Sequence, residues 1–213
     1  MDVALPLAGL GFALGWPLER LIQRFPLGHG TAPSTRRRWV VAAVTAALFA
    51  ALTLRIGFQP RLAPALLLTA LIVPASAIDI RHRIIPDAIN LPGAIAVYLV
   101  AVAAQPDRWL ELLLGGLGAA LFLGLAWFFY PAGMGFGDVK LVLMLGLATG
   151  RYALIAIFAG FVLSLVPSVV LLVRQGVRGR KSAFPFGPFL AGGAVVALLW
   201  GPQLWNLWLN GHS

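Results

Sequence analysis

Long apolar runs follow one another along nearly the whole chain, and this pattern restricts the fold more than any other feature of the sequence. Hydrophobic residues make up 60% of the 213 positions and charged residues only 11%, which is far too apolar for a soluble domain. About 20 apolar residues in a helix cross the roughly 30 Å hydrocarbon core of a bilayer. The sequence therefore predicts an all-α polytopic membrane bundle, with residues 1–213 as a single membrane domain.

We expect about eight transmembrane helices, one of them short. The apolar runs lie at residues 3–18, 39–54, 62–78, 88–104, 109–130, 139–148, 152–173 and 184–209. The sixth run would be only about 15 Å long as a helix. Residues 139–149 therefore either cross a thinned bilayer or form a re-entrant segment, and the sequence leaves this open. The first run lacks a basic leading region and a cleavage site, so we expect a retained anchor.

Basic residues gather on one side of this predicted bundle, provided that the sixth run crosses. Twelve of the sixteen Lys and Arg residues then fall in the loops at residues 19–38, 80–87, 131–140 and 174–181. Because cytoplasmic loops carry an excess of Lys and Arg, we expect this side to face the cytoplasm. Topology thus accounts for the net charge of +9, and we expect no nucleic acid partner.

Two aspartates on this side are the candidates for chemistry. Asp79 follows the third apolar run, and Asp138 follows a glycine-rich segment with Gly133, Gly135 and Gly137. A charged carboxylate near hydrocarbon costs about 2.5 to 3.5 kcal/mol, so such a residue usually marks function. Two neighbouring carboxylates share a proton, which leaves a base to activate water and an acid to protonate a leaving amine. This pairing is typical of aspartyl peptide hydrolysis.

Structural roles are open for the same acids. Asp138 and Asp87 each precede an apolar run and could be helix N-caps, although Asp87 could also support the site. Asp79 could form an ion pair with a basic neighbour, namely Arg81, Arg83 or Lys140. Lys140 could mark orientation by extending to the interface instead of contacting a substrate.

Two other functional classes compete with proteolysis. A small proton-coupled transporter could use Asp79 and Asp138 as a relay, although no inverted repeat is visible and both acids lie at one side. In a non-catalytic scaffold the acids would only cap helices. No metal site is expected, because the chain has no cysteine and its three histidines are scattered.

Three segments, in the same order along the chain, resemble motifs of the type IV prepilin peptidases. Residues 135–140 resemble the Gly-x-Gly-Asp-x-Lys signature of that family. Asp79 followed by residues 85–87 is similar to its first-aspartate segment. Residues 184–191 resemble its C-terminal Pro-Phe-Gly-Pro-x-Leu-Ala box. Ordered matches over most of the chain are more specific than any single motif.

The resemblance implies an eight-helix aspartyl protease of the bacterial inner membrane, from type IV pilus or type II secretion systems. Such an enzyme removes a basic leader from prepilins or pseudopilins at the cytoplasmic face, and needs no cofactor for proteolysis. The apolar substrate segment after the cleavage site would lie against the bundle in the bilayer. Asp79 and Asp138 take the places of the catalytic pair. The residues expected to support the site or bind substrate are Gly133, Gly135, Gly137, Lys140 and Asp87.

Methylation of the new N-terminus, with S-adenosylmethionine as donor, is the second activity that the resemblance implies. Near the start of the chain, Gly15 and residues 24–26 resemble the family's N-terminal segment, but Glu19 departs from it. Many members carry a tetracysteine zinc element after the first helix, whereas residues 19–38 here form a short basic loop without cysteine. Methylation is therefore left open, with Glu19 as the candidate residue.

Overall fold

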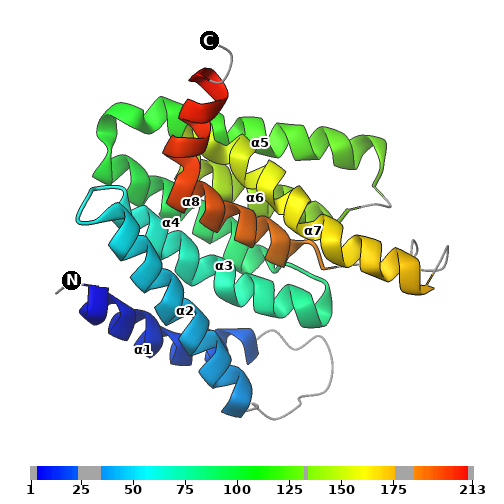
Figure 1. Ribbon diagram of the computed structural model, residues 1–213, viewed down its shortest axis with the longest axis horizontal. Helices are drawn as coiled ribbons and strands as arrows, with labels where there is room; N and C mark the ends of the chain where they lie inside the picture. Colours follow the sequence, from blue (N-terminus) through cyan, green and yellow to red (C-terminus); the bar gives the residue numbers. More distant parts are fainter. Residues whose placement is uncertain (1–3, 24–34, 132–133, 176–184, 211–213) are drawn as a thin grey trace.

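The computed structural model describes residues 4–23, 35–131, 134–175 and 185–210. Within these ranges the chain forms eight α-helices and two short 3-10 helices, and no strand. The elements are α1 (Ala4–Gln23), α2 (Thr35–Ile56), α3 (Leu62–His82), α4 (Asp87–Ala104), η1 (Pro106–Arg108), α5 (Trp109–Phe129), α6 (Phe136–Thr149), η2 (Gly150–Tyr152), α7 (Ala153–Gln175) and α8 (Gly187–Asn210). Figure 1 shows them as one helical bundle, with α1 and α2 at one edge and α5 at the opposite edge.

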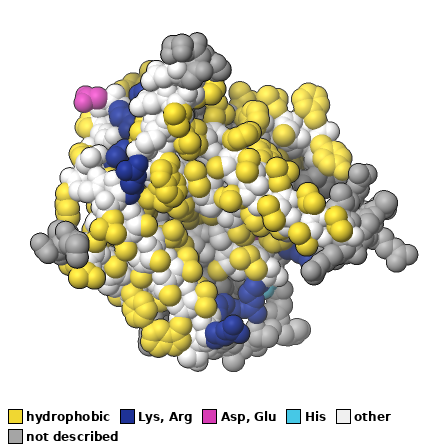
Figure 2. Space-filling model, viewed as in Figure 1, with side chains coloured by type: hydrophobic (Ala, Val, Ile, Leu, Met, Phe, Trp, Pro, Cys, Tyr) yellow, Lys and Arg dark blue, Asp and Glu magenta, His cyan; other side chains and the backbone are white. Residues whose placement is uncertain are grey.

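The surface of the bundle suits a membrane. Six helical stretches of the described part are long and apolar enough to cross one, and α1 adds a shorter apolar helix at Ala4–Gly15. Large hydrophobic side chains are exposed on α5 and α7, among them Leu121, Phe128 and Val166. Figure 2 shows hydrophobic side chains over a broad area between two groups of basic side chains. Such a surface contacts lipid, and the predicted all-α membrane bundle is confirmed.

Most helices extend beyond the apolar runs that predicted them. The third run ends at residue 78, whereas α3 continues to His82. The second run begins at residue 39, whereas α2 begins at Thr35 and includes three arginines in its first turns. Hydropathy detects only the part of a helix that lies in hydrocarbon, and the helix can continue into the headgroup region. Asp79 therefore lies inside a helix.

The short helix α6 lies at the centre of the bundle, in contact with α3, α4, α5, α7 and α8. Nine of its 14 residues are buried. Its closest neighbour is α5, because a Cβ atom on Gly146 would lie 2.6 Å from the carbonyl oxygen of Gly115. Small residues allow two helix backbones to approach in this way. The central position surrounds the first turn of α6 with other helices.

Helix α6 extends from one polar end of the bundle to the other. Its first turn carries Asp138, which lines a cleft with Asp79 from the end of α3. At its far end, Arg151 of η2 contacts Glu111 in the first turn of α5. With 14 residues, α6 is about 21 Å long. This geometry agrees with a short crossing and not with a re-entrant segment.

Candidate active site

Asp79 lies in the last turn of α3, which ends in a left-handed residue. Arg83 has φ 55° and ψ 37°, and its N–H donates to the carbonyl oxygen of Asp79 at 2.8 Å. A left-handed residue commonly ends a helix, although glycine is usual there. The chain then turns through residues 84–86 into α4. This arrangement keeps Asp79 helical and places its side chain, which is 5% exposed, among the neighbouring helices.

Asp138 is the third residue of α6 and not its N-cap. Gly135 is the N-cap, and no side-chain hydrogen bond caps this helix. The N–H of Asp138 donates to the carbonyl oxygen of Gly135 at 3.1 Å. The first helical turn presents unpaired N–H groups and the positive end of the helix dipole, which suits a carboxylate. Because Gly135 holds the N-cap position, the cap interpretation of Asp138 is wrong, and the residue is 7% exposed.

The start of α8 contacts Asp79 through Gly187. The N–H of Gly187 donates to Oδ2 of Asp79 at 2.9 Å. A Cβ atom on Gly187 would lie 2.9 Å from the same oxygen and 3.1 Å from Cδ1 of Ile85, so only glycine fits here without displacing the carboxylate. The preceding residue, Phe186, packs on Phe161 of α7 with ring centroids 5.4 Å apart. Helix α8 thus completes the site around Asp79.

A buried amide connects α4 to the first turn of α6. Asn90 is fully buried, and its Nδ2 donates to the carbonyl oxygen of Gly137 at 3.2 Å. Its Oδ1 has no hydrogen-bond partner within the described ranges. Gly137 itself lies against Ile85, because a Cβ atom there would be 3.4 Å from the Cβ of Ile85. Asn90 and Ile85 therefore hold the backbone directly before Asp138.

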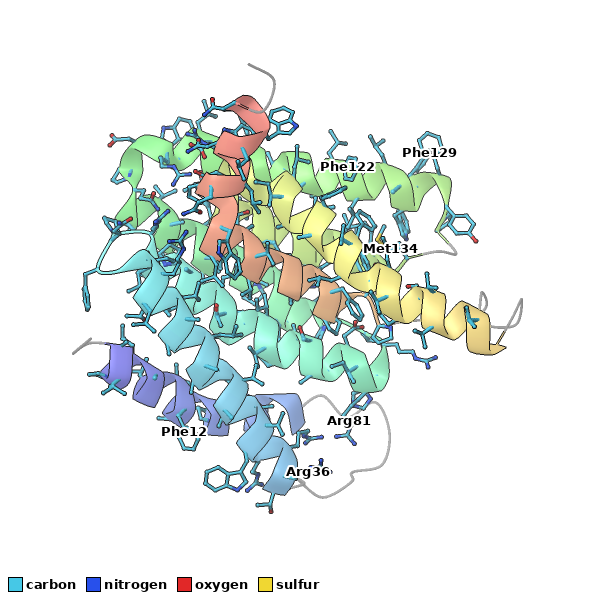
Figure 3. All side chains as sticks on the ribbon, viewed as in Figure 1. Phe12, Arg36, Arg81, Phe122, Phe129 and Met134 are labelled. Atoms are coloured by element: carbon cyan, nitrogen blue, oxygen red, sulfur yellow. The ribbon has the colours of Figure 1, made fainter. Side chains whose placement is uncertain are left out.

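Asp79 and Asp138 line one cleft, which has a volume of about 710 Å³. Its walls come from the end of α3, the loop before α4, the glycine-rich segment and Phe186. Figure 3 labels Arg81 on α3 and Met134 in the glycine-rich segment at the same end of the bundle as Arg36 of α2. In the part of the chain that the structure describes, neither aspartate forms an ion pair. Arg83 and Lys140 also line this cleft, but among the described residues neither of them pairs with Asp79 or Asp138.

Lys140 pairs with Asp87 and not with either cleft aspartate. Its Nζ lies 2.7 Å from Oδ2 of Asp87 and 5.1 Å from the ring centroid of Phe136. Asp87 is the first residue of α4, after the N-cap Pro86, and makes no capping hydrogen bond. Both residues line the cleft. The ion-pair interpretation of Asp79 with Lys140 and the cap interpretation of Asp87 are therefore wrong.

The cleft gathers most of the site residues expected from the sequence. Asp79, Asp87, Gly135, Gly137, Asp138 and Lys140 all line it. Gly133 and the side chain of Glu19 lie outside the described residues. The described residues contain no group of three or more His, Cys, Asp or Glu side chains that could hold a metal ion.

Gly187 lies within residues 184–191, which resemble the C-terminal box of the family, but the sequence predicted no contact for it and no role for Asn90. The signals that could have found them are an amide inside an apolar helix, which needs a partner, and a glycine between aromatic residues and proline. Neither signal identifies a partner by itself. Both contacts join segments far apart in the chain, since Asn90 binds Gly137 and Gly187 binds Asp79.

Comparison with known proteins identifies the family of this chain. A sequence model described as the type IV leader peptidase family matches residues 65–172. A relative from Bacillus subtilis is 31% identical over 170 residues, which is 78% of this chain and 67% of the relative. One from Pseudomonas aeruginosa is 32% identical over 185 residues, 82% of this chain and 62% of the relative. One from Stutzerimonas stutzeri is 35% identical over 157 residues, 70% and 53% of the two chains.

Each of these relatives is named prepilin leader peptidase/N-methyltransferase. The chain spans between 53% and 67% of their lengths. No solved structure matches it. The matched region contains both Asp79 and Asp138. On this evidence the chain belongs to the type IV leader peptidase family.

Proposed function

We propose that this protein is an aspartyl peptidase that removes the leader from prepilins or pseudopilins, with Asp79 and Asp138 as its catalytic pair. The observation that carries the proposal is the pair of buried carboxylates, which α3 and α6 bring into one cleft and neither of which forms an ion pair with a described cation. A charged acid in such surroundings is costly, which favours a functional reason for keeping two. The name of the relatives supports the same reaction.

The reaction needs one ionised and one protonated carboxyl group. The ionised carboxylate accepts a proton from a water molecule while the water oxygen attacks the carbonyl carbon of the scissile peptide bond. The protonated group donates its proton to the carbonyl oxygen. As the tetrahedral intermediate collapses, the first carboxyl group gives the proton that it took from water to the nitrogen, and the second takes back a proton from a hydroxyl group of the intermediate. The C–N bond breaks, which releases the leader and a new N-terminal amine and restores the pair. Two carboxyl groups that share one proton supply both functions at once.

The residues around the pair have supporting roles in this proposal. Gly135 is close to the reacting group, because a Cβ atom there would lie 3.5 Å from Oδ2 of Asp138, and Gly137 is the residue directly before it. Their small size leaves space for a substrate backbone. Asp87 and Lys140 lie beside the cleft as an ion pair, where Asp87 can receive basic residues of a leader.

Asparagine substitutions test the catalytic pair. Asp79→Asn and Asp138→Asn, expressed with a cognate prepilin, are expected to leave the prepilin at full length, because the amide cannot take part in proton exchange. Asp107→Asn is the matched control, since Asp107 is exposed in η1 at the other end of the bundle. Normal processing by either cleft variant, at normal protein levels, refutes the pair. A proton-coupled transporter would not shorten the prepilin in any of these strains.

We further propose that the cleft faces the cytoplasm of the bacterial inner membrane, as the distribution of basic residues indicates. The chain has no cysteine, so a single introduced thiol is unique. Arg36 and Asp107 are exposed at opposite ends of the bundle. In intact spheroplasts, a membrane-impermeant thiol reagent should label Asp107→Cys and leave Arg36→Cys unlabelled until the membrane is permeabilised. The reverse labelling contradicts this orientation.

The name of the relatives also includes N-methyltransferase. As a second proposal, this chain methylates the new N-terminus of the cleaved product. Because the side chain of Glu19 lies outside the described residues, no step through S-adenosylmethionine is derived from this structure. Incubating the purified protein with prepilin and labelled S-adenosylmethionine measures methyl transfer directly. Label on the cleaved product that is lost in Glu19→Gln supports the proposal, and a cleaved product without label refutes it.

A further inference from the structure

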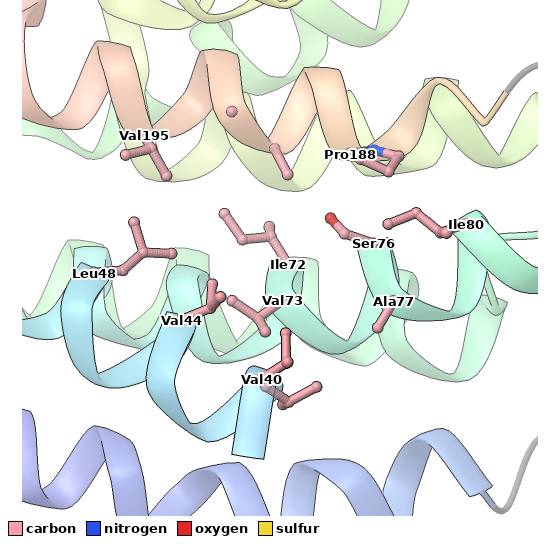
Figure 4. Close-up of a pocket in the computed structure, with 13 residues that line it drawn as sticks. Val40, Val44, Leu48, Ile72, Val73, Ser76, Ala77, Ile80, Pro188 and Val195 are labelled. Carbon is pink, nitrogen blue, oxygen red and sulfur yellow. The ribbon is translucent and has the colours of Figure 1, made fainter. Parts of the chain in front are cut away.

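An apolar groove lies beside the catalytic cleft, between α2, α3 and α8. Its volume is about 370 Å³. Figure 4 shows Val44 of α2, Ile72 and Ile80 of α3, and Val195 of α8 around it. No charged side chain lines the groove, and Ser76 carries the one polar side-chain group among the lining residues. The groove therefore belongs to the hydrocarbon-facing part of the molecule.

The groove ends next to the catalytic aspartate. Ile80 at its end directly follows Asp79, and Pro188 on the opposite wall directly follows Gly187. Gly187 and Asp79 are themselves hydrogen-bonded at 2.9 Å. From Ile72 to Ile80 the groove extends along α3 for about 12 Å. The groove and the cleft share no lining residue, but they are adjacent on α3, because Ile80 lines the groove and Asp79 lines the cleft.

Because the groove is lined by apolar side chains, we expect a helical segment in it and not an extended one. A non-helical segment would leave its backbone N–H and C=O groups unpaired among apolar side chains, whereas a helix pairs them internally. A helix 12 Å long and about 10 Å wide fills on the order of 900 Å³, which is more than the groove holds. The groove therefore accepts side chains from one face of a helix, whose remaining surface contacts lipid.

We propose that this groove binds the apolar transmembrane helix of the substrate, in the segment that follows the scissile bond. The inference rests on the proposed peptidase function, because it is the position of the groove directly beside the cleft that identifies the occupant. The substrate helix lies along α3 and α8, and the chain unwinds past Ile80 to bring the scissile bond to Asp79 and Asp138. The groove fixes the distance between the membrane-embedded helix and the bond that is cut.

Crosslinking tests the position of the substrate. Single cysteines are introduced as Val44→Cys or Val195→Cys on opposite sides of the groove, in an Asp138→Asn background that keeps the prepilin uncut. The prepilin carries one cysteine, moved stepwise through its apolar segment. We expect disulfide crosslinks at substrate positions that recur with a period of about 3.6 residues. Met134→Cys, in the cleft, should crosslink next to the scissile bond.

The matched control is Ala103→Cys, which is exposed on α4 and does not line the groove. It should give no crosslink with the prepilin. If Met134→Cys crosslinks and both groove cysteines do not, the substrate binds the cleft by another route and the groove proposal is overturned. Crosslinks of the groove cysteines to a second copy of this chain, in place of the prepilin, overturn it equally. If none crosslinks and the unsubstituted protein does not cleave prepilin, the peptidase function itself has failed.

Filling the groove gives a second, kinetic test. Ala77 is half-buried on the groove wall, and Ala77→Phe should raise KM for membrane-anchored prepilin about tenfold, because a filled pocket costs helix contacts. Cleavage of a short peptide that spans the scissile bond and lacks the apolar helix should not change. Ala103→Phe should affect neither substrate. Unchanged KM for the anchored prepilin overturns the proposal, and so does an equal loss of activity toward both substrates in a folded Ala77→Phe protein.

Discussion

The two ends of α6 place acids in opposite electrostatic surroundings. At the far end, both oxygens of Glu111 accept hydrogen bonds from Arg108 and Arg151, with the shortest N–O distances at 2.7 Å for each arginine. The backbone N–H of Arg151 adds another at 3.2 Å. At the cleft end, Asp79 accepts one backbone hydrogen bond, and neither aspartate pairs with a cation in the described part.

This difference separates a structural acid, Glu111, from the two acids proposed to be catalytic. Glu111 joins the start of α5 to η2, where Gly150 has φ +58° and approaches the carboxylate so closely that a Cβ atom would lie 2.8 Å from Oε1. The paired charges stabilise the contact between two helices. The cleft aspartates join helices only through the hydrogen bond from Gly187 to Asp79 in the described part, and burying them without an ion pair costs free energy. A carboxyl group that no cation pairs with can gain or lose a proton, which is the property that the proposed reaction requires.

The largest expected effect is on catalysis at the cleft end. Asp79→Asn and Asp138→Asn should each lower kcat by about 10²- to 10⁴-fold, the range for loss of a general acid or base. The thermal unfolding temperature in detergent should not fall, because each substitution removes a buried charge that lacks a cation. Measuring both quantities on one preparation checks the prediction. A large loss of stability would mean that these acids resemble Glu111.

Gly187→Ala should have the next largest effect. The added Cβ would lie 2.9 Å from Oδ2 of Asp79, so the carboxylate must move, and a displacement of about 1 Å can lower the rate about 10²-fold. Gly118→Ala on α5 is the control, because its Cβ would meet nothing within 4 Å. The quantity to compare is kcat for prepilin cleavage. Equal activity of the two alanine variants would show that Gly187 does not position Asp79.

Glu111→Gln should reverse the pattern of the cleft variants. The neutral amide leaves Arg108 and Arg151 without their common carboxylate, at a cost of about 1 to 3 kcal/mol. We expect a lower unfolding temperature and cleavage at the normal rate below it. Asp107→Asn, exposed near the same end, should leave both unchanged. Normal stability of the Glu111→Gln protein would show that Glu111 does not stabilise the fold, and the two ends of α6 would then not differ in this respect.

Asn90→Leu should lower kcat about tenfold with little change in stability. The substitution keeps a similar volume but removes the hydrogen bond to Gly137, which precedes Asp138, and misplacement of a reacting group lowers the rate. Stability should change by less than about 1 kcal/mol, because the lost hydrogen bond is offset by removal of the buried Oδ1, which has no partner in the described part. Thr69→Val, buried away from the cleft, is the control for loss of a buried polar group. A normal kcat in Asn90→Leu would assign Asn90 a packing role only.

The smallest effect concerns Lys140 and Asp87. Asp87 is 58% exposed in its side chain, and exposed ion pairs contribute only about 0 to 1 kcal/mol. A double-mutant cycle with Asp87→Asn and Lys140→Met should therefore give a coupling free energy below about 1 kcal/mol in unfolding experiments. A coupling free energy as large as the loss of stability in Glu111→Gln would show that this ion pair, like that of Glu111, stabilises the fold.

Much of the site was predictable because it depends on local sequence. An acid at the end of an apolar run must lie near the membrane surface, and this located Asp79 and Asp138 on one side. The exact helix boundaries were not predictable in this way. Asp138 was expected before its helix but lies inside the first turn, because α6 begins in the glycine-rich segment, where hydropathy gives no signal.

The residues that complete the site were missed because their partners are distant in the chain. Gly187 and Asp79 are 108 positions apart, and Asn90 and Gly137 are 47 apart. Glu111 and Arg151 are 40 apart. No periodicity or local composition relates such positions, since the contacts exist only after the helices have packed.

The sequence by itself determined that this protein is a membrane-embedded helical bundle with two acids on one side, because the cost of moving apolar and charged groups between water and lipid is a property of each segment. Only the tertiary structure decided which acids form ion pairs with arginine. Packing of α5 against α6 brings two arginines to Glu111. In the cleft, Asp79 accepts a hydrogen bond from a backbone N–H of α8, and Lys140 of α6 pairs with Asp87 instead of Asp79 or Asp138. The glycine-rich segment and Asp138 became half of a candidate active site through that packing.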